Sequence, residues 1–343
     1  MIDSVRPATI QQVAKLAGVS HQTVSRYIRG GGAGVRPAIQ ERVQAAIDDL
    51  DYRPSLTARA MRTRRSGRLA ILLPEGPATG SIHILHGATS AARQAGYDVD
   101  VVTLGGSPAS RGERVLELIE SQLFERVLSL VPLPEAIRGR RLDGLVTVVP
   151  VYDDEMRSIG RLAGAAPVGA MVERLAEWGH RRFVHLAGGL DHTSARCRRD
   201  AYLAAIDRLG LESYGVLVEA WSGQGATDAI LNLPADAGVT AVIAANDVMA
   251  VGAMRGAVLR GWTVPGDLSV TGYDDSELSS LLTPSLTTVQ IDRADLGRQA
   301  MSRLLAALKA DPAPTDEPDF MTVVWRDSTG PAPRPSTNVN GWV

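Results

Sequence analysis

The sequence predicts an α/β protein in which a small all-α helix-turn-helix headpiece precedes a larger body made of two doubly wound parallel-sheet subdomains. Helical apolar periodicity fills the first fifty residues. From Leu69 onward, short aliphatic runs alternate with helical stretches. A chain of 343 residues with 45% hydrophobic content is also too long for one average domain, so two or three units are expected.

Charge is distributed unevenly along the chain. Residues 1–68 carry twelve Lys and Arg against five Asp and Glu, a net charge of +7, whereas the remainder carries −9 and the whole chain −2. A basic module on an acidic body suits phosphate contact by one end alone, because cations near a nucleic-acid backbone release its counterions. An arginine-rich solvated surface would have the same composition, so charge alone leaves both interpretations open.

Composition and motifs also argue against several classes of protein. No apolar run approaches the roughly 18 residues of a membrane span, and the first residues lack the apolar region of a signal peptide, so a cytoplasmic location is expected. The single cysteine, Cys197, excludes an internal disulfide and a multi-thiolate metal site. His83 and His86 have no acidic or cysteine partner nearby, so no metal is expected. Nothing resembles a nucleophile elbow, a phosphate-binding loop or a dinucleotide fingerprint, and neither an enzyme nor a cofactor is expected.

The first expected helix starts with a capping box. The Thr9 hydroxyl can bond the amide of Gln12 while the Gln12 side chain reaches back. The apolar face of this helix is expected to consist of Val13, Ala14, Leu16 and Ala17. Gly18 then ends the helix, because glycine adopts positive φ freely. Ser20 caps a second helix, and the two helices form a helix-turn-helix.

The second helix is expected to enter the major groove of DNA. Its outward residues should be His21, Gln22, Ser25 and Arg26, since Val24 and Ile28 are needed inside. Gln22 can bond adenine bidentately and Arg26 can bond guanine in the same way. Pro37 opens a third helix, whose apolar stripe closes a small core and consists of Ile39, Val43, Ile47 and Leu50.

The body contains seven aliphatic runs that are candidate strands. They span residues 69–74, 99–104, 142–149, 181–187, 215–220, 240–245 and 268–273. The candidate helices between them span residues 85–95, 114–130, 195–209 and 249–259. This alternation predicts two parallel-sheet subdomains with a crevice between them, and ligands bind at such crevices beyond the carboxyl ends of the strands.

The N-terminal sixty residues resemble a known family. The run ATIQQVAKLAGVSHQTVSRYI, followed by VRPAIQERVQAAIDDLDYRPSLTARAMRT, is similar to the headpiece and hinge of the lactose-repressor (LacI/GalR) family. The resemblance implies a linker that becomes a helix on operator DNA, pairs with its dimer mate and inserts an apolar wedge into the minor groove. The wedge position falls on Met61, a softer side chain than leucine. Arg36 stands where the family usually has a capping Ser or Thr, which weakens the cap and adds a cation. The implied DNA-binding residues are Thr9, Ser20, His21, Gln22, Thr23, Ser25, Arg26, Arg29, Tyr52, Pro54, Ala58, Met61, Arg62 and Arg64.

The body resembles the effector domain of the same family, which is similar in architecture to periplasmic sugar-binding proteins. The resemblance lies in AGGLDHTSARCRRDAYLAAI, VIAANDVMAVGAMRG and VPGDLSVTGYDDSELSSLLTPSLTTVQIDRADLG. It implies an effector site formed by Ala78, Ser81, Ile84, Arg196, Trp221, Asn246, Asp274 and Arg293. Planar Arg, Asn and Asp groups offer donors and acceptors to vicinal hydroxyls, while an indole ring covers the C–H face of a pyranose.

Each of the polar candidates also has a purely structural interpretation. Arg196 could begin a helix and pair with Asp191 or Asp200, Asn246 could cap a helix, and Trp221 could belong to the core. His180, in GHRRF, is interpreted as structural.

The resemblance also implies domain boundaries. We expect a headpiece over 1–52, a hinge helix or linker over 53–67, an effector-binding and dimerisation domain over 68–330, and a flexible tail over 331–343. The N-subdomain should comprise about 68–168 plus 291–321 and the C-subdomain about 169–290 plus 322–330. The family usually has a further segment between Val168 and Gly169, with a strand, an acidic effector contact and the first crossover, so this segment is expected to be lost or missing from the sequence given. The run 120–144 is longer than in the family, and Arg293 stands where the lactose repressor has an aromatic residue.

These features predict a sequence-specific DNA-binding transcriptional regulator. We expect a repressor of sugar utilisation genes, galactosides among the candidate sugars, that a small sugar-like effector releases from a pseudo-palindromic operator. The tail has no leucine heptads, so a homodimer is expected and not a tetramer. One alternative is a corepressor-type regulator that binds a purine or another metabolite. The other is a non-regulatory small-molecule binding protein, against which the basic headpiece argues.

Overall fold

The structure is a computed structural model that describes residues 8–30, 33–53, 66–76, 80–137, 145–234, 236–312, 314 and 318–334. The chain divides into two compact units, residues 1–67 with the short segment 122–125, and the remainder. No helix within these described ranges is long and apolar enough to cross a membrane.

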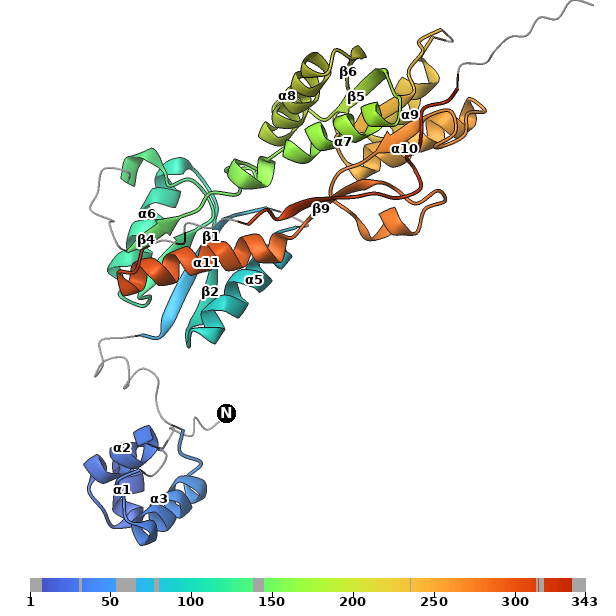
Figure 1. Ribbon diagram of the computed structural model, residues 1–343. Coiled ribbons are helices and arrows are strands. Elements are labelled where there is room, and N and C mark those ends of the chain that lie inside the picture. The colour runs from blue at the N-terminus through green and yellow to red at the C-terminus, as the bar shows by residue number, and fades with distance from the viewer. Residues whose placement is uncertain are drawn as a thin grey trace, which may run out of the picture. The chain divides into compact units, whose positions relative to one another are not determined.

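The described residues of the N-terminal unit form the helices α1 (Ile10–Ala17), α2 (His21–Gly30) and α3 (Pro37–Asp49) (Figure 1). The expected capping box is present, because the Gln12 amide donates to Thr9 Oγ1 at 3.3 Å and the Thr9 amide donates to Gln12 Oε1 at 2.7 Å. Gly18 follows α1 with a φ of 62°. Ser20 Oγ accepts from the Thr23 amide at 3.2 Å. These local predictions are confirmed.

The core of this unit is small and apolar. Its buried members are Val13, Ala14, Ala17, Val24, Val43 and Ala46. Leu16, expected on the inner face of α1, is instead 54% exposed, since positions 13, 14 and 17 already define the buried arc of so short a helix. Arg36 precedes α3 without a side-chain capping bond, as expected.

The N-terminal half of the body is a parallel sheet in the order β2-β1-β3-β4. Its strands are β1 (Arg68–Pro74), β2 (Asp98–Leu104), β3 (Arg126–Ser129) and β4 (Val146–Val148). The helices are α5 (Ser81–Gln94), α6 (Pro108–Glu120) and α11 (Arg293–Lys309), and α5 runs beside α11 (Figure 1). Glycine permits this close approach, because a Cβ at Gly87 would collide with the Ala294 carbonyl and a Cβ at Gly297 with that of Ile84.

The helix expected over residues 114–130 is only partly correct. Helix α6 ends at Glu120, Gln122 adopts a φ of 54°, and β3 follows between β1 and β4. Strand β3 is buried along most of its length. Its apolar run therefore lacks the alternation that separates a strand from a helix in sequence.

The C-terminal half of the body is a second parallel sheet in the order β6-β5-β7-β8. Its strands are β5 (Arg182–Ala187), β6 (Glu212–Val218), β7 (Ala241–Ala244) and β8 (Ser269–Thr271). Its helices are α7 (Ala166–Glu177), α8 (Thr193–Arg208), α9 (Gly223–Leu231) and α10 (Asp247–Leu259). The predicted class, an all-α headpiece with a two-subdomain parallel-sheet body, is confirmed.

The two halves of the body are joined by residues 149–165 and by the antiparallel pair β9 (Thr288–Ile291) and β10 (Met321–Val324). The first crossover was expected to be lost at Val168, and this part of the expectation is wrong, because the chain connects the two halves before helix α7, in which Val168 and Gly169 lie. The loss of the family's further strand and acidic effector contact stays a prediction. The crossover precedes that helix and contains a bridge between Tyr152 and Ser158. A connection without regular periodicity carries little sequence signal, which explains the error. Buried His180 bonds Thr240 and the Gly330 carbonyl, in agreement with its structural interpretation.

Candidate nucleic-acid interface and ligand site

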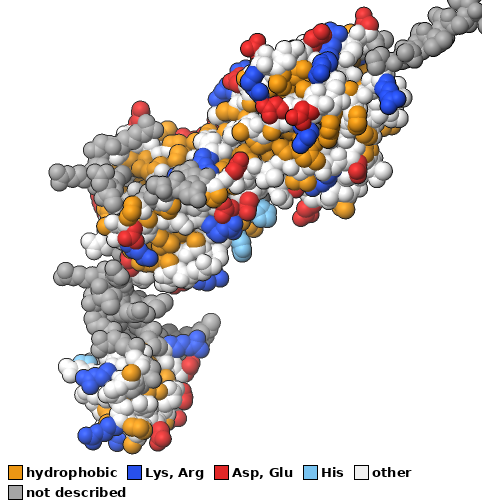
Figure 2. Space-filling view, in the orientation of Figure 1, with side chains coloured by type: hydrophobic (Ala, Val, Ile, Leu, Met, Phe, Trp, Pro, Cys, Tyr) orange, Lys and Arg blue, Asp and Glu red, His pale blue; other side chains and the backbone are white. Residues whose placement is uncertain are grey.

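Helix α2 presents polar side chains to solvent. His21, Gln22 and Arg26 are exposed, while Val24 is fully buried. Tyr27 Oη donates to Gln44 Oε1 at 2.8 Å and ties α2 to α3. The small core thus holds the outer face of α2 at the surface. Figure 2 shows Lys and Arg side chains on the surface of this N-terminal unit.

The prediction that Ser25 points outward from helix α2 is wrong. It is only 9% exposed, because its small side chain fits in the inner arc of α2 beside Val24. Thr9 and Ser20 are exposed and cap helices, while Tyr52 and Thr23 are half-buried. Contacts of these residues with DNA stay predictions. The side chain of Arg29 and the whole of Pro54, Ala58, Met61, Arg62 and Arg64 lie outside the described residues.

The expected ligand residues of the C-terminal half gather at one edge of its sheet. Trp221 follows β6, Asn246 follows β7 and Asp274 follows β8. Arg196 lies in the first turns of α8, the helix that follows β5. Because these strands are all parallel, their carboxyl ends meet at the same edge.

An ion pair joins this edge to the N-terminal half of the body. Arg293 Nη2 donates to Asp274 Oδ1 at 3.1 Å, with side-chain exposures of 22% and 37%. Arg293 also packs on Gly80 before α5, where a Cβ would lie 2.6 Å from its Nε. Two expected effector residues therefore meet. Ser81 starts α5 and is half-buried, Ile84 is fully buried within it, and Ala78 lies outside the described residues.

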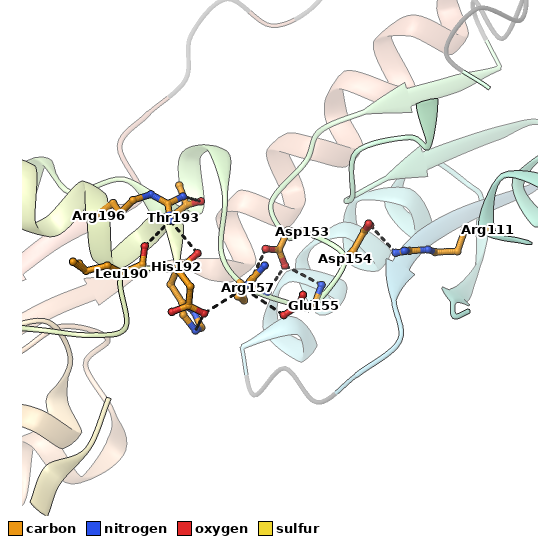
Figure 3. Close-up of polar contacts among 10 residues, drawn as sticks. Arg111, Asp153, Asp154, Glu155, Arg157, Leu190, His192, Thr193 and Arg196 are labelled. Carbon is orange, nitrogen blue, oxygen red and sulfur yellow. Dashed lines mark hydrogen bonds and ion pairs between the residues drawn. The ribbon is translucent and has the colours of Figure 1, made fainter. Parts of the chain in front are cut away.

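Asn246 and Arg196 make structural contacts. Asn246 Oδ1 accepts from the Met249 amide at 2.9 Å and caps α10. Arg196 donates to the carbonyls of Leu190 and Asp191 at 2.7 and 2.9 Å (Figure 3). It therefore holds the loop before α8 through backbone oxygens, and not through an ion pair with the carboxylate of Asp191 or Asp200.

Arg198 is the arginine of α8 that sequence reasoning missed. It is 5% exposed, donates to the Ala245 carbonyl and lies 3.7 Å over the centroid of the Tyr273 ring. A sequence signal for it exists, because Ala195, Arg198 and Tyr202 follow the i, i+3, i+7 spacing of an inner helical stripe and are all buried. Arg196 falls outside that stripe.

The Trp221 ring is packed against its neighbours, but its indole N–H has no hydrogen-bond acceptor among the described residues. Its ring lies against Gly188, where a Cβ would collide with the indole, and it meets His192 edge-on with 5.3 Å between centroids. It also packs against the core of the C-terminal half. Its Nε1 is nevertheless buried without a hydrogen-bond partner among the described residues. Both interpretations of Trp221 therefore have support.

The backbone at this edge is strained. Trp221 and Asp274 have φ values of 64° and 114°, and their neighbours Ala220 and Asp275 have 45° and 49°. Such values are uncommon for residues other than glycine and cluster at ligand sites. Within the described residues, no group of three or more His, Cys, Asp and Glu is placed to hold a metal ion.

A second contact between the two halves involves Arg157 of the crossover. Arg157 Nε bonds Asp153 Oδ2 at 2.7 Å, and its Nη1 reaches Asp191 Oδ2 at 3.3 Å (Figure 3). Arg157 thereby links the crossover to the loop before α8. Like the pair of Arg293 with Asp274, this contact connects segments that follow strands of different sheets.

An apolar face is exposed on the C-terminal half. Val258 and Leu259 of α10 are 68% and 59% exposed, and Leu278 and Leu281, in and just after the 3₁₀ turn Glu277–Ser280, are 66% and 75% exposed. A neighbouring groove of about 650 Å³ is lined by α10 and by Trp262, Leu282 and Pro284, among others. Exposed apolar clusters of this kind mark association surfaces.

Comparisons with known proteins agree with this architecture. Residues 9–55 match the model of bacterial regulatory proteins, lacI family, and residues 172–329 match a periplasmic binding protein-like domain. The chain is 30% identical over 313 residues to the ribose operon repressor of Escherichia coli K12, covering 87% of this chain and 92% of that protein. It is also 30% identical over 316 residues to the HTH-type transcriptional repressor PurR of Haemophilus influenzae, covering 87% and 90%.

Solved structures extend the likeness to three dimensions. The lac repressor dimer bound to operator and the anti-inducer ONPF has a TM-score of 0.74 and 27% identity, over 94% of this chain and 99% of that chain. The complex of the transcriptional regulator CelR with cellobiose has a TM-score of 0.58 and 28% identity, over 94% and 100%. With the capped helix-turn-helix and the two-sheet body already described, these likenesses show that the chain belongs to the LacI family of bacterial regulatory proteins.

Proposed function

We propose that this protein is a homodimeric DNA-binding transcriptional repressor whose operator affinity is set by a small, sugar-like effector. The observation that carries the proposal is the exposed set His21, Gln22 and Arg26 on α2, within a headpiece that matches the lacI family over residues 9–55. Amide and guanidinium groups at such positions read base edges in the major groove.

The apolar face formed by Val258, Leu259, Leu278 and Leu281 supports the homodimer. A dimer presents two recognition helices to half-sites about one helical turn apart, which requires a pseudo-palindromic operator. A lac repressor structure with this fold is a dimer on operator DNA. The proposal includes the boundaries 1–52, 53–67 and 68–330 for headpiece, hinge and effector domain, a cytoplasmic location and no catalytic activity.

The effector site of this proposal is the carboxyl edge of β5–β8 together with Arg293. Asp274 and Arg293 form its ion pair, and Arg198 replaces Arg196 as its buried guanidinium. The cellobiose complex of CelR and the name of the ribose operon repressor favour a sugar. The similarity to PurR keeps a corepressor mechanism, in which ligand strengthens DNA binding, as the second candidate.

Selection from random duplex DNA with the full-length protein, followed by fluorescence anisotropy, tests the regulator. We expect an enriched pseudo-palindrome, and Arg26→Ala should reduce discrimination at one base pair of each half-site by about 1–3 kcal/mol. Arg174→Ala removes an exposed arginine of the body and is the matched control. Equal losses on specific and random DNA for Arg26→Ala would refute the recognition-helix assignment, and failure to enrich any sequence would refute the regulator.

A further inference from the structure

A polar pocket lies beside helix α6 in the N-terminal half of the body. Its volume is about 460 Å³, and it is lined by the start of α6, by the segment that follows β3 and by the crossover. This volume falls within the range of roughly 300–1,000 Å³ that small-molecule sites occupy. None of its lining residues belongs to the expected effector contacts.

The charges of this pocket are mixed, with carboxylates in excess. The charged lining residues are Arg111, Arg157, Glu135, Asp153, Asp154 and Glu155. Both guanidinium groups are already paired, because Arg111 Nη1 lies 2.7 Å from Asp154 Oδ1 and Arg157 Nε lies 2.7 Å from Asp153 Oδ2. Four carboxylates against two guanidinium groups disfavour an anionic occupant.

One donor of this lining nevertheless lacks an acceptor. Arg111 Nε is buried and has no hydrogen-bond partner among the described residues, although the same side chain is paired through Nη1. The side chain of Arg111 is only 12% exposed, so water has little access to it. Buried donors are normally satisfied, and an occupant with an oxygen acceptor would satisfy this one. Glu155, 71% exposed, can accept from the same occupant, and a hydroxyl group both accepts and donates.

The pocket is connected to the proposed effector site through Arg157. Arg157 lines the pocket, and its Nη1 lies 3.3 Å from Asp191 Oδ2 in the loop before α8. Figure 3 shows the charged side chains in one row that runs from Arg111 through Arg157 to that loop. The same loop carries His192, whose ring meets Trp221 edge-on. The pocket and the carboxyl edge of β5–β8 are therefore neighbours along one loop.

Resting on the proposed effector site, we propose that the effector is an uncharged oligosaccharide of at least two units, one at the carboxyl edge of β5–β8 and the next in the pocket beside α6. A hydroxyl of the second unit accepts from Arg111 Nε and donates to the carboxylate of Glu155. Pro108, Pro132 and Leu133 contact its C–H groups, as apolar side chains do in ligand pockets.

Isothermal titration of the full-length protein tests the number of units. The probes are D-glucose, D-galactose, cellobiose, maltose, lactose and melibiose, with cellobionate and lactobionate as charged counterparts. We expect at least one disaccharide to bind at least tenfold more tightly than either of its units alone, and more tightly than its charged counterpart.

Arg111→Lys retains the cation beside Asp154 but removes the Nε donor, and it should weaken disaccharide binding by about tenfold without changing monosaccharide binding. Leu133→Trp fills the pocket and should have the same selective effect. Arg114→Lys changes an exposed arginine of the same helix, paired with Glu117, and should change nothing. A merely structural role for Arg111 would lower the melting midpoint without changing the ratio of disaccharide to monosaccharide affinity.

Monosaccharides that bind as tightly as their disaccharides, a charged counterpart that binds more tightly, an unchanged ratio in both pocket variants, or no binding of any disaccharide would each overturn the inference. Operator binding without ligand is measured in parallel by fluorescence anisotropy. If the parent protein binds its operator, any of these outcomes overturns only the second unit, whereas a parent protein that binds no operator overturns the proposed function.

Discussion

Replacing Asp247 with alanine is expected to destabilise the C-terminal half of the body strongly. Asp247 is 4% exposed at the start of α10. Its Oδ2 accepts from the Ser276 amide at 2.7 Å and from Ser279 Oγ at 2.8 Å, and its Oδ1 accepts from Thr288 Oγ1 at 2.5 Å. One carboxylate therefore holds the segment after Asp274 and strand β9 against α10.

The magnitude follows from these three bonds. A hydrogen bond to a charged group contributes about 1.5–3 kcal/mol, but the two hydroxyls can rotate to other acceptors and the alanine variant no longer buries a charge. The Ser276 amide is the donor that cannot turn away, so we expect a net loss of about 3 kcal/mol. At roughly 2–4 °C for each kcal/mol in a domain of this size, the melting midpoint should fall by about 6–12 °C.

Differential scanning calorimetry at pH 7 measures this change. Asp228→Ala is the control, because Asp228 is exposed on α9 and its carboxylate accepts from the side-chain amide of Gln224 at the same surface. Surface changes of that kind stay within about 0.5 kcal/mol. The melting midpoint of Thr288→Val should lie between those of Asp247→Ala and Asp228→Ala. If Asp247→Ala melts within about 1 °C of Asp228→Ala, the carboxylate does not hold this segment and the argument fails.

The pH dependence of the same residue gives a second test. Burial raises the pKa of Asp247 in spite of its hydrogen bonds. A raised folded-state pKa means that the folded protein retains the proton more strongly than the unfolded chain does, so this contribution to stability is present at acidic pH and is lost as pH rises through the folded-state pKa. The stability difference between the parent and Asp247→Asn should therefore become less favourable to the parent as pH increases. If the stability of the parent relative to Asp247→Asn instead increases with pH, the raised pKa is contradicted.

Three further outcomes are expected. Burial lowers the pKa of His185 to about 4, so the unfolded chain binds a proton near pH 6.5 that the folded protein does not bind. The free energy of unfolding should therefore drop by roughly 2 kcal/mol between pH 7 and pH 5. The melting midpoint of His185→Phe should depend less on pH than that of the parent, and an equal dependence in thermal melts would contradict this. Leu281→Asp places a charge on the exposed apolar face and should convert the dimer to monomers in sedimentation velocity, and an unchanged dimer would place the interface elsewhere. Thr9→Ala removes the cap of α1 and should cost about 1 kcal/mol, measured as faster amide hydrogen exchange in α1, and unchanged exchange would show that the cap contributes nothing.

Local features of this protein were determined by the sequence alone. The capping box of Thr9 and Gln12, the turn at Gly18 and the cap at Ser20 each involve residues at most four positions apart. Their hydrogen bonds form wherever the helix forms, whatever packs around it. The alternation of strands and helices likewise predicted the two parallel sheets, because the apolar periodicities of a strand and of a helix depend on the geometry of neighbouring residues.

Which side chains meet was decided by the tertiary structure. Arg196 and Arg198 are two positions apart with the same chemistry, and only the burial of one face of α8 separates a loop-holding arginine from one stacked on Tyr273. The pairing of Asp274 with Arg293 joins segments that belong to different halves of the body. Such contacts depend on the order of the strands and on which helix faces the sheets cover, and neither is encoded in the spacing of neighbouring residues.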